Sequence, residues 1–356
     1  MTGLLFFRFF IIAVIYIETG SCAPAVNFAY EEYFLKGKDL EEDLLMLWRS
    51  EPTIVVGRFQ NTLEEVNAGF AEAHHIQVIR RISGGGAVYH DLGNVCFSFI
   101  LHDTQPNVID KSKYTRPVVD ALAQLGVHAE LTHRNDLAVG GKKFSGNAMA
   151  LRKNRLLFHG TLLFDTDLEM LERALKTSEV KILSKGVQSA RSGVTNLKEY
   201  LFEEMTVIQF KERLKELLFA GASPVMYIPC KDDLDAIQEL VKIKYETWSW
   251  NFGNNPRSTI HRFRPLPEGI LEIHLELEKG CIQLCYLTGN FATPIRFGEV
   301  EKSLKNIRYT YAEIRNALIG LDLENKLGSI SKDDLVQWIA AYETFLPKGH
   351  VYPVRD

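Results

Sequence analysis

The sequence has few cysteines, and none is spaced to hold a metal or form a redox centre. Its five cysteines, at positions 22, 96, 230, 281 and 285, include no Cys-x-x-Cys pair. The starting motif of zinc ribbons and thioredoxin-like sites is therefore missing. An odd number of widely spaced cysteines is also unlike a disulfide framework. A reducing compartment is expected, and we take it to be the cytoplasm.

An excess of basic charge is missing as well. The chain carries 41 lysines and arginines against 45 aspartates and glutamates, a formal net charge of −4. General nucleic-acid binders are usually clearly basic, so nucleic acid is not an expected partner. The 356 residues are 46% apolar and 24% charged. This is the composition of a soluble globular enzyme, and the length suits two domains.

Long apolar runs are absent except at the N-terminus, where residues 4–17 form one that Arg8 interrupts. The run is too short to span a membrane comfortably, so no membrane association is expected. It has the length of a signal-peptide core, and secretion remains the alternative, although the residues that follow make a poor cleavage site. We prefer an N-terminal extension, residues 1–14, that leads into a first core strand at residues 14–17.

The periodicity of the remaining chain indicates both helices and strands. Apolar residues recur at helical spacing over residues 28–46, with charged residues between them, and again over residues 234–245. Residues 53–57, 77–82 and 95–101 are short runs rich in strand formers. The two kinds of element alternate without a strict β-α-β rhythm. This order predicts an α+β fold with a mixed or antiparallel sheet.

A turn-rich stretch at residues 251–264 indicates a domain boundary, and prolines follow at positions 265 and 267. Beyond it, two strands joined by a turn and three helices would form a small α+β unit. We therefore expect a main domain of residues 15–255 and an accessory domain of residues 256–356.

The most unusual string is R-R-I-S-G-G-G-A-V-Y-H-D-L-G-N, residues 80–94. Consecutive glycines cost conformational entropy, and a chain keeps them where a ligand approaches the backbone or where φ is positive. Their bare N–H groups can bind an anion. The spacing is that of neither a Walker loop nor a Rossmann fingerprint. On glycine content alone, a tight hairpin is an equal alternative. Strand alternation should aim one of the adjacent Arg80 and Arg81 at the ligand of the loop, which favours an anion site.

A second cluster consists of Arg134, Asn135 and Asp136, followed by G-G-K-K-F-S-G-N-A at residues 140–148. Lys143 directly precedes small residues suited to line a pocket, where its ammonium group could hold a phosphate or polarise an acyl carbonyl. Asp136 could orient that lysine or bind Mg²⁺. The basic residues that follow, at positions 152, 153 and 155, are expected on a solvated hairpin.

Two further strings complete the pattern. His159 lies in F-H-G-T, residues 158–161, and a lone histidine in an apolar stretch is more typical of a hydrogen-bonded structural residue than of a catalyst. Residues 184–196 are polar and contain glycine, which makes them a candidate lid.

These four strings, in this order, resemble the lipoate–protein ligase A family, which is related to biotin–protein ligases and octanoyltransferases. The similarity covers residues 15–345. It implies a biotin/lipoate-ligase-type catalytic domain followed by a small α+β accessory domain. It also implies an enzyme that uses ATP and Mg²⁺ to activate lipoate as lipoyl-AMP. The acceptors would be lysines of apo lipoyl domains, in the acyltransferase subunits of 2-oxoacid dehydrogenases, and of the glycine cleavage H protein. A monomer is expected.

The resemblance also implies roles for individual residues. Lys143, Arg81 and Asp136 are the expected catalytic residues, and Asp136 is the expected metal ligand. The expected substrate- and cofactor-binding residues are Ser83, Gly84, Gly85, Gly86, Ala87, Val88, Tyr89, His90, Asp91, Asn94, Lys143, Ser145, Gly146 and His159. Residues 176–193 match a segment that folds over the adenylate, with Gly193 where relatives usually carry an arginine.

The nearest alternative is an octanoyl or lipoyl transferase that works without ATP-dependent activation, through a cysteine acyl-enzyme. Cys96 lies within the expected strand at residues 95–101 and is interpreted as core, while the other cysteines lie outside the matched strings. A regulator that binds lipoate or a nucleotide without catalysis is a further alternative. The presence of both Lys143 and Arg81 disfavours it.

Overall fold

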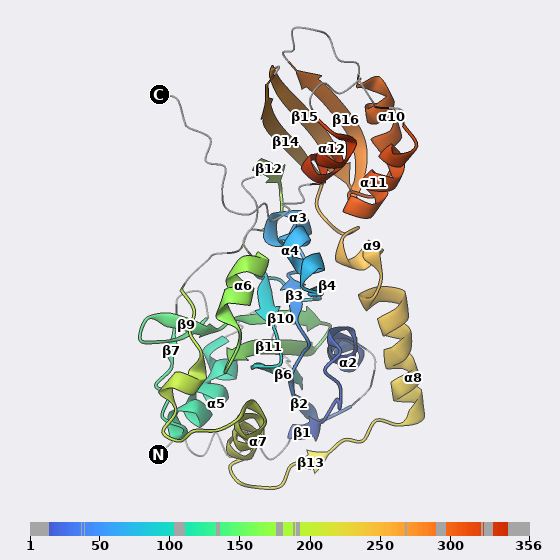
Figure 1. Cartoon of the computed structure of the whole chain (residues 1–356). Coiled ribbons are helices and arrows are strands. Elements are labelled where there is room, and N and C mark those ends of the chain that lie inside the picture. The colour runs from blue at the N-terminus through green and yellow to red at the C-terminus, as the bar shows by residue number, and fades with distance from the viewer. Residues whose placement is uncertain are drawn as a thin grey trace.

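The computed structural model describes residues 14–36, 38, 40–102, 111–132, 136–175, 181–187, 189, 193–267, 269–289, 297–321, 323 and 330–340. Helices and strands are interleaved along the chain (Figure 1). The helices are α2 (Pro24–Lys36), α3 (Thr62–Glu65), α4 (Ala68–Ala73), α5 (Lys111–Gln124), α6 (Leu168–Leu175), a 3-10 helix (Leu197–Tyr200), α7 (Val207–Leu218), α8 (Lys231–Leu240), a π-helical turn (Val241–Tyr245), α9 (Trp248–Asn251), α10 (Gly298–Leu304), α11 (Tyr311–Ile319) and α12 (Lys332–Ile339). The strands are β1 (Val14–Ile17), β2 (Asp43–Trp48), β3 (Thr53–Val56), β4 (Gln77–Arg80), β5 (Val88–His90), β6 (Asn94–His102), β7 (Glu130–Leu131), β8 (Leu137–Val139), β9 (Lys142–Ser145), β10 (Asn147–Arg152), β11 (Arg155–Leu163), β12 (Lys181–Ser184), β13 (Val225–Met226), β14 (Ser258–Leu266), β15 (Gly269–Glu278) and β16 (Cys281–Gly289).

A six-stranded mixed sheet forms the centre of the larger part of the molecule, in the order β10-β11-β6-β2-β1-β13. β1 is parallel to both β2 and β13, while the other neighbours are antiparallel. β6 and β11 are buried along almost their whole length, so both faces of the sheet are covered. The predicted α+β fold with a mixed sheet is confirmed, and so is the first core strand at residues 14–17. The first 13 residues lie outside the described part of the chain.

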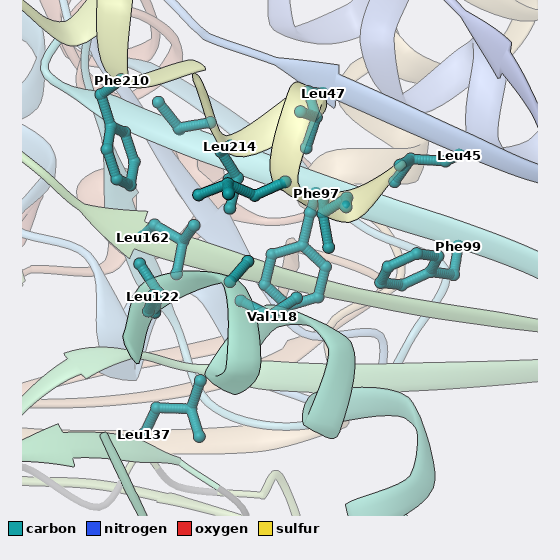
Figure 2. Packing of buried hydrophobic residues seen from close by; sticks show 14 of the residues in the cluster. Leu45, Leu47, Phe97, Phe99, Val118, Leu122, Leu137, Leu162, Phe210 and Leu214 are labelled. Carbon is teal, nitrogen blue, oxygen red and sulfur yellow. The ribbon is translucent and has the colours of Figure 1, made fainter. Parts of the chain in front are cut away.

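Alternate side chains of the central strands enter two separate cores. Phe97 and Phe99 of β6 pack with α5 and with Leu214 of α7 on one face, as Figure 2 shows. Cys96 and Ile100 of the same strand pack with α2 on the other face. This is the two-residue period of a strand. Replacing a buried phenylalanine such as Phe97 by alanine costs about 3–5 kcal/mol of stability, so both cores hold the sheet rigid beneath the site.

Helix α7 illustrates how local sequence sets these elements. It begins with a capping box, in which Thr206 Oγ1 accepts the Gln209 N–H at 3.2 Å and Gln209 Oε1 accepts the Thr206 N–H at 2.8 Å. Phe210 and Leu214, four residues apart, then lie on one face of the helix and are fully buried in the core shown in Figure 2.

Two three-stranded sheets carry the segments singled out in the sequence. The sheet β4-β3-β5 positions residues 83–86, here named the glycine turn, between the ends of β4 and β5. The meander β7-β8-β9 places Lys143 on β9, and the chain continues from β9 into β10 at the edge of the central sheet. Arg134 and Asn135 lie outside the described residues.

The last part of the chain forms an antiparallel sheet, β12-β14-β15-β16, covered on one face by α10, α11 and α12. Leu271, Ile273 and Leu275 alternate into the core beneath these helices. The edge strand β12 comes from residues that precede α7 in the chain. Helices α8 and α9 run along one side of the molecule to reach this sheet (Figure 1). Within the described residues, no helix combines the length and apolar character that a membrane span needs.

The helix expected over residues 28–46 ends earlier than predicted. α2 stops at Lys36, and Asp43–Trp48 is strand β2 in the middle of the central sheet. The sequence of β2, D-L-L-M-L-W, is apolar at successive positions because both of its faces are covered. Periodicity alone does not separate such a run from a buried helix. The helix expected over residues 234–245 is present as α8, continued by the π-helical turn.

Two further expectations need correction. The linker expected over residues 251–264 is shorter, because β14 already begins at Ser258. Pro265 belongs to β14 but lies beyond the residues that pair with β12. A strand tolerates proline at such a position because no ladder hydrogen bond is lost. Arg155, expected on a solvated hairpin, is buried. Its guanidinium group donates to the carbonyl oxygens of Phe34 at 2.7 Å and Leu40 at 2.5 Å, which ties β11 to the end of α2.

Candidate functional site

The glycine turn is packed closely on two sides. Gly85 has a φ of +90°, a left-handed conformation that favours glycine. A Cβ placed on Gly57 would lie 2.1 Å from the Gly85 carbonyl oxygen, and one on Gly86 would lie 2.9 Å from Ser189 Oγ. β4 and β5 flank β3 and do not pair with each other, so the hairpin alternative is wrong. Positive φ explains Gly85 and close approach explains Gly86, while Gly84 shows neither.

Arg81 faces the glycine turn, while Arg80 points the other way. Arg81 is 5% exposed. Its Nη2 donates to the carbonyl oxygens of Gly84 and Gly86 at 2.7 Å each, and its Nε donates to Ser83 Oγ at 2.9 Å. Burial lowers the pKa of Arg81 to about 10, so the guanidinium group stays charged at neutral pH. Arg81 therefore holds the turn from within and gives it a positive charge.

Lys143 points its ammonium group toward Asp136 and Gly146. Lys143 Nζ lies 3.1 Å from Asp136 Oδ1, and the two side chains are 23% and 20% exposed. A Cβ on Gly146 would lie 3.2 Å from the same Nζ, so the amine lies directly against this glycine. The backbone of Lys143 is fixed by hydrogen bonds to Gly193 and Thr195, at 3.0 and 2.9 Å. The backbone of Lys143 is therefore fixed, while its side chain remains partly accessible.

A cavity of ≈ 280 Å³, here named the first cavity, brings the two strings together. The charged and glycine part of its wall consists of Arg81, Gly85, Gly86, Asp136 and Lys143. The apolar part includes Phe28, Trp48, Val55 and Cys96. Small-molecule sites commonly combine an apolar wall with a few convergent polar groups that fix the orientation of the ligand. This wall suits an apolar chain that ends in an anionic group.

A second cavity of ≈ 670 Å³ adjoins the first, since both are lined by Ala87, Val88, Lys143, Gly146, Thr161 and Ser189. Tyr89 and Ser145 line only the second. Ser189 Oγ accepts the Ala87 N–H at 2.8 Å and donates to Glu65 Oε2 at 2.5 Å. The candidate lid thus touches the glycine-rich string through Ser189. Residues 176–180, 188 and 190–192 of the expected lid lie outside the described residues.

Both ring nitrogens of His159 are occupied. Its Nε2 lies 2.7 Å from Ser83 Oγ, and its Nδ1 lies 2.9 Å from Glu31 Oε1. Ser83 Oγ also accepts the Nε–H of Arg81, so Arg81, Ser83, His159 and Glu31 form one continuous chain of hydrogen bonds. Ser83 is 1% exposed and lines neither cavity. The chain of bonds therefore fixes the His159 ring in the wall of the first cavity, and its contact with a ligand stays a prediction.

His90 is a second histidine of the first cavity. Its ring stacks on that of Phe28, with 6.4 Å between the centroids. Burial, followed by the charges of Arg81 and His159, lowers the pKa of His90 to about 3. The ring is therefore neutral at pH 7 and adds no charge to the apolar part of the wall.

Four of the expected binding residues line neither cavity: Ser83, Gly84, Asp91 and Asn94. Asp91 accepts hydrogen bonds from the N–H groups of Gly93 and Asp167, at 2.9 Å each. Asn94 is fully buried and donates to Cys96 Sγ at 3.1 Å. Asp91 therefore braces the backbone behind the site, whereas Asn94 Oδ1 is buried without a hydrogen-bond partner among the described residues. Direct contact between them and a ligand stays a prediction.

A resident metal site is not built from the side chains that the structure describes. Among these residues, no group of three or more His, Cys, Asp or Glu side chains is arranged to hold a metal ion. Asp136 offers one carboxylate to the wall of the first cavity. Mg²⁺ is commonly bound by one or two carboxylates together with phosphate and water oxygens. The residues present fit a magnesium–nucleotide complex better than a closed metal site.

Glu31 and Trp48 are among the members of the site that the sequence patterns missed. Glu31 is fully buried and accepts a hydrogen bond from Ser98 Oγ at 2.6 Å, and Ser98 accepts the Trp48 Nε1–H at 2.9 Å. The signal was present in α2, whose sequence P-A-V-N-F-A-Y-E-E-Y-F-L-K is apolar on all sides. A helix of this kind is buried, so its acidic residues must find buried partners.

Two family models match the chain. Residues 23–219 match the lipoyl protein ligase A/B catalytic domain, and residues 255–339 match the bacterial lipoate protein ligase C-terminus. The lipoate–protein ligase LplJ of Bacillus subtilis (strain 168) is 40% identical over 320 residues, which cover 89% of this chain and 96% of that protein.

Solved structures that are 25–26% identical resemble the chain over about two thirds of its length. A lipoate–protein ligase A bound with ATP is 26% identical with a TM-score of 0.54, and the match covers 68% of this chain and 98% of that one. A putative lipoate protein ligase of T. acidophilum with bound lipoic acid is 26% identical with a TM-score of 0.53, covering 67% and 98%. A bi-partite lipoate protein ligase of Thermoplasma acidophilum, described with its E2 lipoyl domain, is 25% identical with a TM-score of 0.53, covering 67% and 96%. With two cavities that meet at Lys143, and with these matches along its length, the chain belongs to the lipoate–protein ligase family.

Proposed function

We propose that this chain is an ATP-dependent lipoate–protein ligase, which forms lipoyl-AMP and then transfers the lipoyl group to a lysine of an acceptor protein. One observation carries the proposal: the Lys143 ammonium group and the glycine turn wall the same cavity, next to a second, larger one. The apolar wall of the first cavity suits the alkyl chain and dithiolane ring of lipoate. The second cavity offers room for the nucleotide.

In the first step, a carboxylate oxygen of lipoate attacks the α-phosphorus of ATP, and pyrophosphate leaves. The barrier is mainly electrostatic because two anions must meet. Arg81, Lys143 and the N–H groups of the glycine turn supply a fixed positive potential where they meet. Mg²⁺ held by Asp136 and phosphate oxygens would neutralise charge on the leaving pyrophosphate. Exclusion of water protects the mixed anhydride from hydrolysis.

In the second step, the amine of the acceptor lysine attacks the acyl carbonyl and AMP leaves. Lys143 lies at the junction of the two cavities, so the same ammonium group can stabilise the oxyanion that develops. No side chain of the enzyme forms a covalent bond to the acyl group. The leaving AMP and the transferred acyl group account for every atom of the mixed anhydride.

The acceptors we propose are lipoyl domains of 2-oxoacid dehydrogenases and the glycine cleavage H protein. The E2 lipoyl domain described with the archaeal relative supports the first of these. A cytoplasmic monomer is proposed, and the five unpaired cysteines and the need for ATP support that compartment. We also propose residues 15–255 as the catalytic domain and 256–356 as the accessory domain, which the separate core of the C-terminal sheet supports.

The direct test is mass spectrometry of a purified apo lipoyl domain after incubation with the enzyme, Mg-ATP and lipoate. We expect a mass increase of one lipoyl group at a single lysine. Matched reactions without ATP and without lipoate should leave the acceptor unmodified. An acceptor that stays unmodified in the complete reaction, with enzyme shown to be folded, contradicts the proposal.

The alternative without ATP needs a cysteine nucleophile, and Cys96 is the candidate. Cys96 is part of the core, as expected, and it also lines the first cavity, with its Sγ 3.7 Å from His90 Nδ1. Burial, followed by the charge of Glu31, raises the pKa of the Cys96 thiol well above its usual value. The thiolate is the nucleophile, so an acyl-cysteine is disfavoured. Transfer from an octanoylated donor without ATP, together with an acylated enzyme in the intact mass spectrum, would favour this alternative.

A further inference from the structure

Arg80, the neighbour of Arg81, is a fully buried hydrogen-bonding centre away from both cavities. Its guanidinium group donates to seven oxygen atoms, which are carbonyl, hydroxyl and amide oxygens. They are Trp250 O at 3.1 Å, Gly57 O at 3.0 Å, Arg58 O at 3.2 Å, Gln60 O at 2.8 Å, Thr62 Oγ1 at 2.8 Å, Asn251 O at 3.1 Å and Asn255 Oδ1 at 2.6 Å. No carboxylate takes part, so ion pairing is not the reason for a cation here.

The acceptors belong to two segments that are far apart in the chain. One is residues 57–62, which follow β3, and the other is residues 250–255, which end α9 and lead into β14 of the C-terminal sheet. The Thr62 N–H also donates to Asn255 Oδ1 at 2.9 Å, although the two residues are 193 positions apart. The Arg80 N–H donates to Asn251 Oδ1 at 2.9 Å, and Trp250 Nε1 donates to the Arg80 carbonyl at 2.7 Å. Arg80 therefore joins the connector of the C-terminal sheet to the segment after β3.

The segment after β3 is in turn the support of the glycine turn. A Cβ on Gly57 would lie 2.1 Å from the Gly85 carbonyl oxygen, so the two backbones are in direct contact. The Arg58 N–H donates to the Ser83 carbonyl oxygen at 2.9 Å. Gln60 Oε1 accepts a hydrogen bond from the Gly57 N–H at 2.8 Å, and Gln60 Nε2 donates one to Ser189 Oγ at 3.1 Å. Any shift of the carbonyl oxygens at residues 57–60 would therefore move the wall of the first cavity.

We infer that Arg80 is a positioning residue of the ligation reaction: it fixes the glycine turn through residues 57–60 and couples that turn to the connector at residues 250–255. An arginine suits this role because its planar group offers five N–H donors in a rigid arrangement, which a lysine does not match. Removing it leaves buried carbonyl groups without partners. Misplacement of catalytic groups by about 1 Å costs on the order of a hundredfold in rate.

Asn255 distinguishes this coupling from a purely local role of Arg80. Asn255 lines neither cavity, yet it holds Arg80 Nη2 through its Oδ1. A change at Asn255, in the connector, should therefore slow adenylate formation. Because both residues act through one arrangement, the effects of Arg80→Lys and Asn255→Ala on rate should not be additive.

The full-length wild type is compared with Arg80→Lys, Asn255→Ala and the double variant. The role inferred for Arg80 rests on the proposed ligase activity. A matched control is Arg155→Lys, because Arg155 is also buried and donates to the carbonyl oxygens of Phe34 and Leu40, away from the connector. Pyrophosphate release with lipoate and Mg-ATP gives kcat and KM, and thermal unfolding gives the Tm of each variant. An inactive wild type would count against the proposed function and not against the role of Arg80.

We expect kcat to fall by about tenfold or more in both single variants, with KM for ATP nearly unchanged, since ground-state binding groups remain. The double variant should be no slower than the slower single variant. Arg155→Lys should lower Tm by a similar amount without this loss of kcat. The inference is overturned if Asn255→Ala, which retains the guanidinium group, has the kcat of the wild type, or if Arg155→Lys loses as much kcat as Arg80→Lys.

Discussion

Two cationic regions meet at the first cavity, and they differ in how their donors are used. Arg81 is 5% exposed, and its N–H groups are taken up by oxygen atoms of the protein, in the glycine turn and at Val55. Lys143 is more open, and among the described residues its ion-pair partner is Asp136. The buried cation therefore builds the shape of the site, while the accessible cation can act on substrate. Removing each should therefore cause a different kind of failure.

The largest expected effect is on activity, from Lys143→Ala. The rate of adenylate formation should be at least about 10²–10³-fold lower than in the wild type, which is the loss typical of one oxyanion-stabilising donor. Its Tm should be nearly unchanged because the side chain is only partly buried. Pyrophosphate release and thermal unfolding measure the two quantities. Lys142→Ala, at the exposed neighbour on β9, is the control and should retain full activity. A normally active Lys143→Ala enzyme would remove this lysine from the mechanism.

The next effect sharpens the contrast, because Arg81→Lys should lower activity and stability together. Arg81 donates to four oxygen atoms, those of Ser83, Gly84, Gly86 and Val55. A lysine has three N–H donors on a single nitrogen, so at least one buried oxygen atom loses its partner, at about 1–3 kcal/mol. Urea unfolding gives the change in stability, and pyrophosphate release gives the change in rate. If Arg81→Lys keeps wild-type stability while losing activity, Arg81 behaves like Lys143 and the distinction between the two regions is wrong.

The third expected effect, which is the smallest at neutral pH, appears in acid. Burial, followed by the charges of Arg81 and His159, holds the pKa of His90 at about 3, against an ordinary value of 6.5. Between these pH values the unfolded chain binds a proton that the folded protein excludes. Stability should therefore fall as the pH is lowered through this window, by up to about 1.4 kcal/mol per pH unit for one proton. In urea unfolding at several pH values, His90→Gln should flatten this dependence, and His128→Gln, at an exposed histidine, should leave it unchanged. Parallel curves for all three proteins would contradict the buried neutral histidine.

Much of the fold and part of the site were predictable from sequence, for identifiable reasons. The strands at residues 53–57 and 95–101, the glycine turn and the position of Lys143 follow from local patterns of β-formers, glycine and charge. Strand β2 was mistaken for helix, because burial on both faces erases the period that separates the two. Arg155 was placed in solvent because its acceptors, in Phe34 and Leu40, are distant in the chain.

The division of labour between Arg80 and Arg81 was only half predictable. Strand alternation predicted that one of them would face the loop, and it does. It gave no sign that the other would join residues 57–62 to residues 250–255, because that contact depends on tertiary structure alone. Glu31 is similar, since its partner His159 lies 128 positions away. Long-range polar contacts of this kind have no local period, so they escape a reading of single segments.

The central claim is that the amides of the glycine turn and the Lys143 ammonium group bind the same mixed anhydride. The most direct measurement is a crystal structure of the enzyme with a non-hydrolysable sulfamate analogue of lipoyl-AMP. The account predicts that the sulfamate and acyl oxygens lie within hydrogen-bonding distance of Lys143 Nζ and of the N–H groups of Gly85 or Gly86, with the alkyl chain in the first cavity. An analogue bound with its acyl–sulfamate linkage away from Lys143 would contradict it.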